Sequence, residues 1–303
     1  MRVIYRKNMA HTEAQRHGGV LLSVSPWLCV ILCLLCVVPA RAQVTVTLDN
    51  DILALRGRGA PADYDYTHGL TVAVETGARR FLVGQRIYTP RRDAPEPVPG
   101  ERPYAGWLFA GAQIAIGQRS MEVEIGSTGP AALGEPVQNG VHRLLGPERQ
   151  EGWEHQTGLE PGILLRIQEA RRFDWGPARI EPALSVSLGN VRTAASAGAS
   201  AEVGSGPGPY ARIGARHEWV ARDIFLDGNS FRSRSTARKL PFVSEGEAAV
   251  GFRARRWSAE YRFIARTREY RAQPGGHAYG SLVLSVPRAN SARRGTPLYK
   301  EAE

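Results

Sequence analysis

The sequence predicts an all-β protein: a twelve-stranded antiparallel transmembrane β-barrel of the bacterial outer membrane, with a short helix in an extracellular loop. Three observations carry this prediction: an N-terminal export signal, polar–apolar alternation through most of the chain, and a regular difference between short and long links. The chain has 303 residues, of which 43% are hydrophobic and 22% charged. That composition excludes coiled coils, collagens and low-complexity disordered chains.

The first 42 residues predict an export signal. Four basic residues precede an uncharged stretch whose most apolar part is 27–38, and Ala40-Arg41-Ala42 has the A-x-A form of a cleavage site. We expect cleavage after Ala42, with translation starting at Met1 or Met9. An uncleaved membrane anchor is the alternative, because the uncharged stretch is long enough to span a bilayer.

Removing this signal changes the chemistry that the mature chain can perform. All three cysteines, Cys29, Cys33 and Cys36, lie in the signal, so the mature chain has no thiol catalysis, disulfide or zinc–thiolate site. The formal charge falls from +10 to +6. A charge of +10 alone would suggest nucleic acid or an anionic membrane, whereas the mature chain is only mildly basic and we expect no nucleic-acid partner.

Alternation with a period of two predicts the strands. Met121, Val123 and Ile125, for example, alternate with Glu122 and Glu124. Apolar residues on one face suit lipid, and charged residues on the other suit a polar lumen. The twelve candidate strands are 43–55, 65–77, 80–89, 103–117, 119–128, 157–170, 176–189, 193–204, 209–222, 244–254, 256–268 and 277–287.

The links between these strands separate the barrel from a soluble sandwich, which would also alternate. Short turns at one end and long loops at the other are typical of an outer-membrane barrel with both termini in the periplasm. Closure is required because an open sheet edge would leave unpaired backbone groups in the bilayer. We therefore predict one barrel domain over 43–287, a polar tail over 288–303, and a monomer. The long links are 56–64, 90–102, 129–156, 223–243 and 269–276, whereas the link at 190–192 is short.

The third long loop contains the first candidate site residues. Apolar residues recur at helical spacing over 137–144, which predicts a short helix on which Gln138 and His142 share a face. An imidazole can take a proton from water near neutral pH, and Glu148 follows closely enough to orient it. The alternative is a helix that only caps the barrel mouth. The sequence has neither a G-x-S-x-G elbow nor an H-E-x-x-H motif.

A second group lies where the first two strands approach the same rim. Asn50 and Asp51 lie at the outer end of the first strand, and Thr67 opens the second. Strand parity places Asp51 and Thr67 inward but Asn50 outward, so joint action of Asn50 and Asp51 needs a local bulge. Carboxylate and amide oxygens suit Ca²⁺. An Asp/Asn-rich turn at a strand end is the alternative.

The second long loop supplies basic residues. Arg91 and Arg92 could bind phosphate groups on the outer surface, although a solvated basic loop is equally compatible with their charge. Under the strand assignment, Asp51, Thr67, Arg92 and His142 all map to the outward end of the barrel. That shared position favours one site over unrelated polar residues.

Taken together, these residues resemble the outer-membrane lipid A 3'-O-deacylase family. The resemblance covers most of the mature chain and is strongest over 49–156. The matching pieces are Asn50-Asp51, Asp65-Tyr-Thr-His-Gly69, Ile87-Tyr-Thr-Pro90, Gly100-Glu-Arg102, Gly129-Pro130, Val137-Gln-Asn139, His142-Arg-Leu-Leu-Gly-Pro-Glu148 and Trp153-x-x-Gln156.

The resemblance implies Ca²⁺-dependent hydrolysis of the 3'-linked acyloxyacyl chain of lipid A, the membrane anchor of lipopolysaccharide. It implies a site between the barrel wall and the loop helix, facing the outer leaflet. In the family, a basic residue of the second long loop also contributes; the pattern there has Lys, and this chain offers Arg91 or Arg92. The family's other roles fall on Asn50, Asp51, Thr67, Gln138, His142 and Glu148, with His142 as general base and Asn50 and Asp51 at the metal.

Two other functions remain open from the sequence. A catalytically silent barrel, acting as a pore or adhesin, explains the export signal and the alternation but not the combined motifs. An outer-membrane phospholipase would need a serine paired with a histidine, and no spacing here identifies such a pair.

Overall fold

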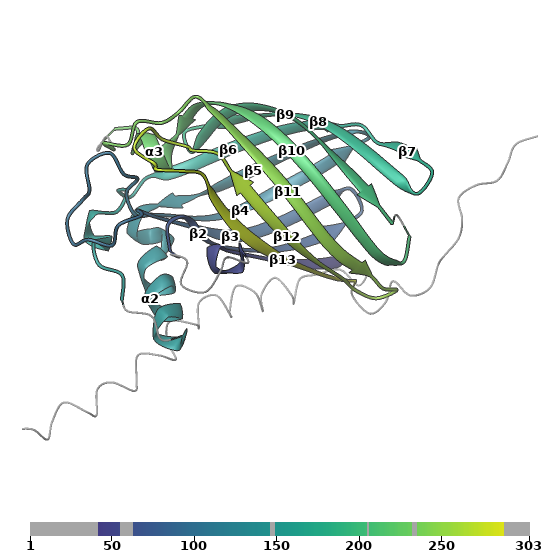
Figure 1. The fold of residues 1–303 in the computed structure, drawn as a ribbon, viewed down its shortest axis with the longest axis horizontal. Coiled ribbons are helices and arrows are strands. Elements are labelled where there is room, and N and C mark those ends of the chain that lie inside the picture. Colours follow the sequence, from purple (N-terminus) through teal and green to yellow (C-terminus); the bar gives the residue numbers. More distant parts are fainter. Residues whose placement is uncertain (1–41, 55–62, 146–148, 205, 232–234, 288–303) are drawn as a thin grey trace, which may run out of the picture.

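The computed structural model describes residues 42–54, 63–145, 149–204, 206–231 and 235–287. Twelve of its strands form one closed antiparallel wall, because β1 pairs with both β2 and β13 and because β6 pairs with β8 (Figure 1). The wall consists of β1 (Gln43–Asn50), β2 (Asp65–Thr76), β3 (Arg79–Thr89), β4 (Ala105–Ile116), β5 (Arg119–Thr128), β6 (Pro161–Ala170), β8 (Ala178–Gly189), β9 (Arg192–Val203), β10 (Gly208–Asp223), β11 (Phe242–Arg253), β12 (Ser258–Arg266) and β13 (His277–Pro287).

This wall confirms the predicted twelve-stranded barrel. A three-residue strand, β7 (Phe173–Trp175), pairs with the start of β8 in a hairpin at the end away from α2. The first and sixth strands are shorter than predicted, because Asp51–Ala54 forms a 3-10 turn, η1, and β6 begins only at Pro161. The predicted signal and tail lie outside the described residues, apart from Ala42. None of the helices in the described ranges has the length and apolarity needed for a membrane crossing.

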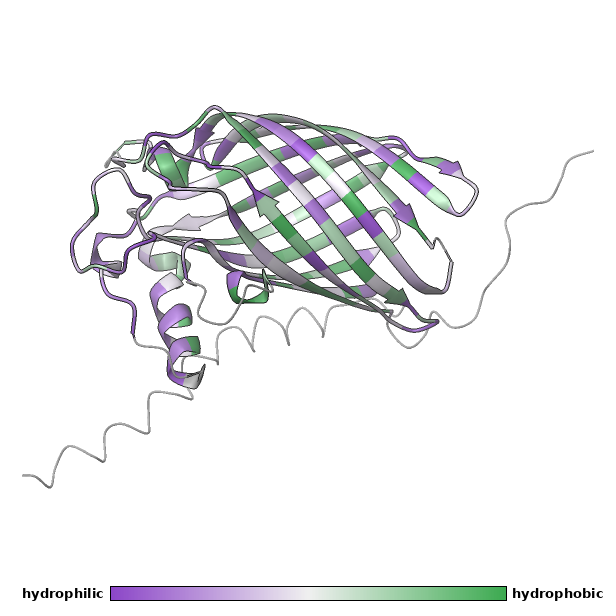
Figure 2. Cartoon of the chain, viewed as in Figure 1, coloured by the Kyte–Doolittle hydropathy of each residue, from purple (hydrophilic) through white to green (hydrophobic). Residues whose placement is uncertain are grey.

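Hydrophilic and hydrophobic residues alternate along the strands (Figure 2), and the two faces of the wall therefore differ in chemistry. Apolar side chains such as Leu184, Ile213 and Val250 point outward and are 64%, 65% and 60% exposed. In a bilayer these side chains contact lipid, which explains how so much apolar surface is tolerated on a folded chain.

Inside the barrel, charged side chains pair with one another. Arg86 donates two hydrogen bonds to Glu124, at 3.0 and 2.8 Å, and the Trp107 indole donates a third at 3.1 Å. Arg192 pairs in the same way with Glu218 at 2.7 Å. Removing one member of such a pair would leave an uncompensated charge in a low-dielectric interior. The intact pairs therefore stabilise the barrel by linking residues on different strands.

At the loop end, buried polar residues fill the barrel mouth. Asp65 is fully buried and accepts hydrogen bonds from Tyr270 at 3.2 Å and Gln273 at 3.0 Å. Arg102, also buried, lies 3.7 Å from Asp65 and donates to Glu269 at 3.1 Å. The link between β12 and β13 is therefore anchored to the loop before β4.

Two short helices lie on opposite sides of the wall. Helix α3 (Ile224–Asp227) packs inside, where Phe225 stacks on Tyr88 at 4.3 Å. Helix α2 (Gly134–Leu145) is the predicted loop helix, and it lies beside the barrel at its loop end. The turn before it, η2 (Gly129–Ala132), touches the outer wall, where a Cβ on Gly106 would approach Ala132 to 2.8 Å. This arrangement puts α2 on the lipid side of the barrel.

The pKa of the buried Glu269 carboxyl predicts how acid affects the stability of the barrel mouth. Burial by itself would raise the pKa of the Glu269 carboxyl, but Arg266 and Arg102 lower that pKa to about 2, against an ordinary value of 4.5. The lowered pKa means that these contacts stabilise the fold fully above pH 4.5, and that this stabilisation is lost as the pH falls towards 2. We expect the thermal unfolding temperature in detergent, followed by the electrophoretic mobility shift, to fall over that range.

The matched variant is Glu269→Gln, which cannot titrate. It should unfold at a lower temperature near neutral pH and should lose less of its unfolding temperature on acidification. Equal acid sensitivity in the two proteins would contradict this assignment.

Candidate functional site

The site begins where β1 stops. Asn50 is the last residue of the strand, and its side-chain oxygen accepts a hydrogen bond from the Ile52 amide at 2.8 Å. The next residue, Asp51, starts η1 and is only 2% exposed, with Oδ2 accepting from the Tyr64 amide at 3.2 Å. Joint action of Asn50 and Asp51 required a local bulge, but the pairing of β1 has no register shift here; a 3-10 turn redirects the chain after Asn50 instead.

The turn η1 packs on the outer wall of the barrel. The Tyr261 hydroxyl donates to the Leu53 carbonyl at 2.6 Å. Gly280 of β13 makes this approach possible, because a Cβ there would collide with Leu53. Asp51 is therefore held against the outside of the sheet rather than in the lumen.

A bulge does occur, but in β2. The pairing of β2 with β3 shifts between Tyr66 and His68, so Thr67 is the extra residue. Its hydroxyl lies 2.6 Å from that of Thr89 at the end of β3. Simple parity placed Thr67 inward; the extra residue reverses the alternation, and Thr67 faces the outer wall, so that prediction was also wrong.

Asp63, just before β2, connects these segments to the loop helix. Its backbone has a φ of 62°, a left-handed conformation that few residues other than glycine adopt and that Asp tolerates better than most. The Thr89 hydroxyl donates to the Asp63 carbonyl at 2.6 Å. The Asp63 carboxylate lies 3.0 Å from His142 Nε2 and accepts a long hydrogen bond from Gln138 at 3.4 Å.

Helix α2 presents Gln138 and His142 on its buried face, as their spacing predicted. Each is only 4% exposed. Trp153, in the turn η3 (Trp153–His155), donates to the Gln138 side-chain oxygen at 3.0 Å. It also packs on Gly134, where a Cβ would approach the indole to 2.5 Å. Trp153 therefore sets both the position of the helix and the orientation of Gln138.

The imidazole also borders a cavity. A space of about 330 Å³ lies along α2 and reaches His142 from the side of the 149–150 segment. The residues that line it are Glu135, Pro136, Asn139, His142, Arg143 and Arg149. Arg149 pairs with Glu135 at 2.8 Å. A small polar molecule such as water thus has room next to His142.

The structure does not bring the second-loop arginines to this group. Arg91 donates to Asp65 at 3.0 Å and lies over the Tyr64 ring, in the barrel mouth. Arg92 donates to Glu101 at 2.7 Å. Binding of substrate phosphates by these two residues stays a prediction, as does the role of Glu148, which lies outside the described residues.

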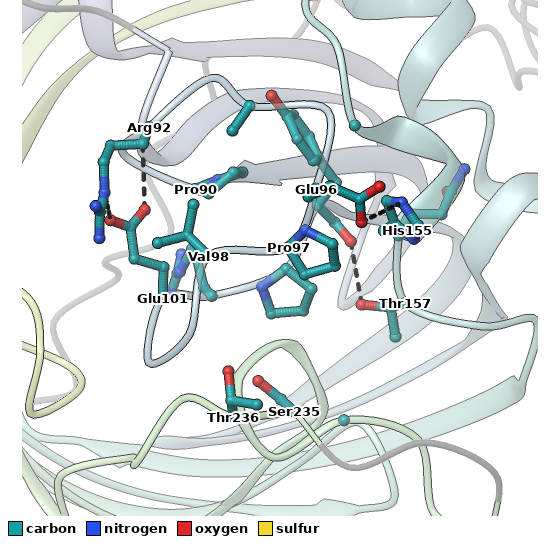
Figure 3. Close-up of a pocket in the computed structure, with 17 residues that line it drawn as sticks. Pro90, Arg92, Glu96, Pro97, Val98, Glu101, His155, Thr157, Ser235 and Thr236 are labelled. Carbon is teal, nitrogen blue, oxygen red and sulfur yellow. Dashed lines mark hydrogen bonds and ion pairs between the residues drawn. The ribbon is translucent and has the colours of Figure 1, made fainter.

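Arg92 instead borders a second cavity, of about 210 Å³, between three outer loops (Figure 3). Prolines line much of it, including Pro90 and Pro97. His155 points into it and lies 3.5 Å from Glu96. This cavity contains no residue of the Asp63–His142 group.

The side-chain oxygen atoms near η1 are of the kind that binds calcium. Asp51 offers a buried carboxylate and Asn50 an amide oxygen, and Ca²⁺ takes about six to eight oxygen ligands. Within the described ranges, no three His, Cys, Asp or Glu side chains are grouped so that they could hold a metal ion.

Asp63 is the site residue that sequence reasoning missed. Asp63-Tyr64-Asp65 reads as a polar link before a strand, and nothing in its spacing separates Asp63 from Asp65. In the structure, both have positive φ, yet one faces His142 and the other faces the barrel mouth. Only the path of the chain before β2 and the contacts of each residue make that distinction.

Comparisons with known proteins give one family profile and several solved structures. The profile of a family described as outer membrane protein LpxR matches residues 28–287. The solved structure of LpxR from Salmonella typhimurium aligns with 20% identity and a TM-score of 0.69, over 80% of this chain and 99% of that one. The β domain of the Bordetella autotransporter BrkA aligns with 12% identity and a TM-score of 0.43, over 81% and 98%. No curated protein matches.

Trp153→Phe tests the docking of α2. The substitution keeps an aromatic ring but removes the indole donor, leaving the buried Gln138 oxygen without this hydrogen bond at a cost of about 1–3 kcal/mol. We expect limited proteolysis to cleave α2 about tenfold faster, since about 1.4 kcal/mol corresponds to a factor of ten in local opening. Trp175→Phe is the control, because Trp175 is 78% exposed in the β7–β8 hairpin. Equal cleavage rates would contradict the role of Trp153.

Proposed function

Because this chain belongs to the LpxR family of outer membrane proteins, we propose that it is an outer-membrane esterase that hydrolyses the 3'-linked acyloxyacyl chain of lipid A. The observation that carries the proposal is the pair of the buried His142 and the half-buried Asp63 on the outer wall of the barrel, 3.0 Å apart. A base at this position reaches the membrane side of the wall, where a lipid ester is found. A pore would place its functional groups in the lumen instead.

His142 is the general base of the proposed reaction. It takes a proton from a water molecule in the adjoining cavity, and the hydroxide adds to the carbonyl carbon of the ester. The tetrahedral intermediate then collapses with cleavage of the bond to the sugar 3'-oxygen. That oxygen receives the proton from His142, so the products are a free acyloxyacyl acid and a 3'-hydroxyl.

Other residues of the group hold the reacting molecules. Gln138 is fixed by Trp153 and Asp63 and positions water or the ester. Thr67, through Thr89, supports the backbone of Asp63. Asp51, with Asn50, would hold a calcium ion, which when bound supplies Lewis-acid polarisation of the carbonyl.

The anionic glucosamine phosphates need basic partners. Arg91 and Arg92 are the sequence candidates, but each already pairs with a carboxylate, Asp65 and Glu101 respectively. Arg143 lines the same cavity as His142, and we propose it as the more direct phosphate ligand; Arg149 also lines this cavity, but it pairs with Glu135. The substrate would enter sideways from the outer leaflet.

His142→Ala tests the proposed activity. Loss of the base should reduce release of the 3'-linked chain at least about 100-fold, since general-base catalysis contributes about 10²–10⁴. The measurement is mass spectrometry of lipid A, beside glycerophospholipids, from cells that express each variant. The barrel should retain its heat-modifiable migration.

The matched control is His155→Ala, which removes a histidine from the second cavity and should leave lipid A cleavage intact. Unchanged cleavage in His142→Ala would refute the base. Cleavage of glycerophospholipids instead of lipid A would identify a phospholipase, and no cleavage of either lipid by the wild type would favour a silent barrel.

Calcium removal tests the metal. Chelation with EGTA should abolish cleavage by the wild type, and added Ca²⁺ should restore it. Asp51→Asn removes the buried carboxylate charge, so we expect it to need at least about tenfold more Ca²⁺, corresponding to about 1.4 kcal/mol of lost binding. Isothermal calorimetry of Ca²⁺ binding provides a readout besides activity. Full cleavage in EGTA would exclude a calcium requirement.

A further inference from the structure

The Asp63–His142 contact is a hydrogen bond whose donor and acceptor can be assigned. A carboxylate can only accept a hydrogen bond, and the nitrogen that faces it is Nε2, at 3.0 Å. Nε2 must therefore carry the hydrogen, and in the neutral imidazole the lone pair lies on Nδ1. Both side chains are shielded from water, with 5% exposure for His142 and 16% for Asp63, so solvent competes little for this contact.

The backbone of Asp63 shows that the contact is imposed by the fold. A residue with a Cβ at φ 62° is strained, and such strain persists only where surrounding contacts over-determine it. Here the Thr89 hydroxyl fixes the Asp63 carbonyl, and Gln138 contacts the second carboxylate oxygen. The Tyr64 amide, one residue further, is fixed by Asp51. Glycine would adopt this conformation without strain, but it would have no carboxylate.

We infer that Asp63 is a positioning residue that orients the His142 ring, fixes its tautomer, and makes Nδ1 the basic nitrogen. It also stabilises the imidazolium that forms when His142 takes the proton from water, because its carboxylate stays next to that charge. The assignment rests on the proposed esterase activity for its role in the reaction. The tautomer itself depends only on the geometry.

Two substitutions of Asp63 distinguish the role of its carboxylate from the role of its backbone conformation. Asp63→Asn keeps the shape of the side chain but removes the charge. Asp63→Gly removes the carboxylate and suits the observed φ, so relief of backbone strain should offset part of the stability lost with the His142 and Gln138 contacts. Both should lower kcat about 100-fold or more while the apparent KM for lipid A stays unchanged, since the carboxylate acts on the base rather than on substrate binding.

Asp65→Asn is the matched control. Asp65 has nearly the same φ, 64°, but it pairs with Arg91 and Arg102 in the barrel mouth. This variant should unfold at a lower temperature and keep the kcat of the wild type. If the Asp63 variants behave like Asp65→Asn, losing stability but not kcat, the inference is overturned.

Two further readouts complete the test. In protein labelled with ¹⁵N-histidine, the His142 signals, assigned from their absence in His142→Ala, should show a protonated Nε2 and an unprotonated Nδ1 in the wild type, and mixed tautomers in Asp63→Asn. The opposite tautomer in the wild type would overturn the inference whether or not the protein cleaves lipid A. Recovery of full kcat in Asp63→Asn at high Ca²⁺ would instead assign Asp63 to the metal, which also overturns it. A wild type with the expected tautomer that cleaves no lipid A would overturn the proposed function and the catalytic part of the inference.

Discussion

The need to pair every backbone amide and carbonyl within the bilayer governs this molecule. An open sheet would leave two edges unpaired in hydrocarbon, so β1 must meet β13. Once the wall is closed, each strand has a lipid face and a lumen face, and its side chains alternate between them. The apolar outer surface and the ion pairs inside both follow from that closure.

The same constraint explains why the site lies where it does. Within a regular strand, each side chain can only face lipid or lumen, so two neighbouring residues cannot converge on one reaction. The candidate site uses three departures from regularity: the turn at Asp51, the bulge at Thr67, and the left-handed Asp63. All three lie at the loop end of the barrel, at or near the ends of β1 and β2. Fewer backbone groups are committed to strand pairing there.

The charged lumen has a structural role that differs from that of the site. Pairs such as Arg86–Glu124 lie deep in the wall, and Arg102 with Glu269 closes the mouth. In these groups, each charged side chain is paired with one of opposite charge. They are therefore better suited to stabilising the barrel than to conducting ions. The outer wall contains the Asp63–His142 pair instead, next to a cavity, which fits a reaction on a membrane lipid.

Much of the fold could be determined from the sequence alone, because alternation and link length are local patterns. They predicted all twelve strands, and helical spacing predicted α2 with Gln138 and His142 on one face. Parity could not determine where Thr67 and Asp51 point, because one extra residue or one 3-10 turn interrupts the alternation at that point. Only the tertiary structure decided that Asp63, rather than Asp65, meets the imidazole: that choice depends on Thr89, a residue distant in the sequence that holds the Asp63 carbonyl, and on where α2 packs.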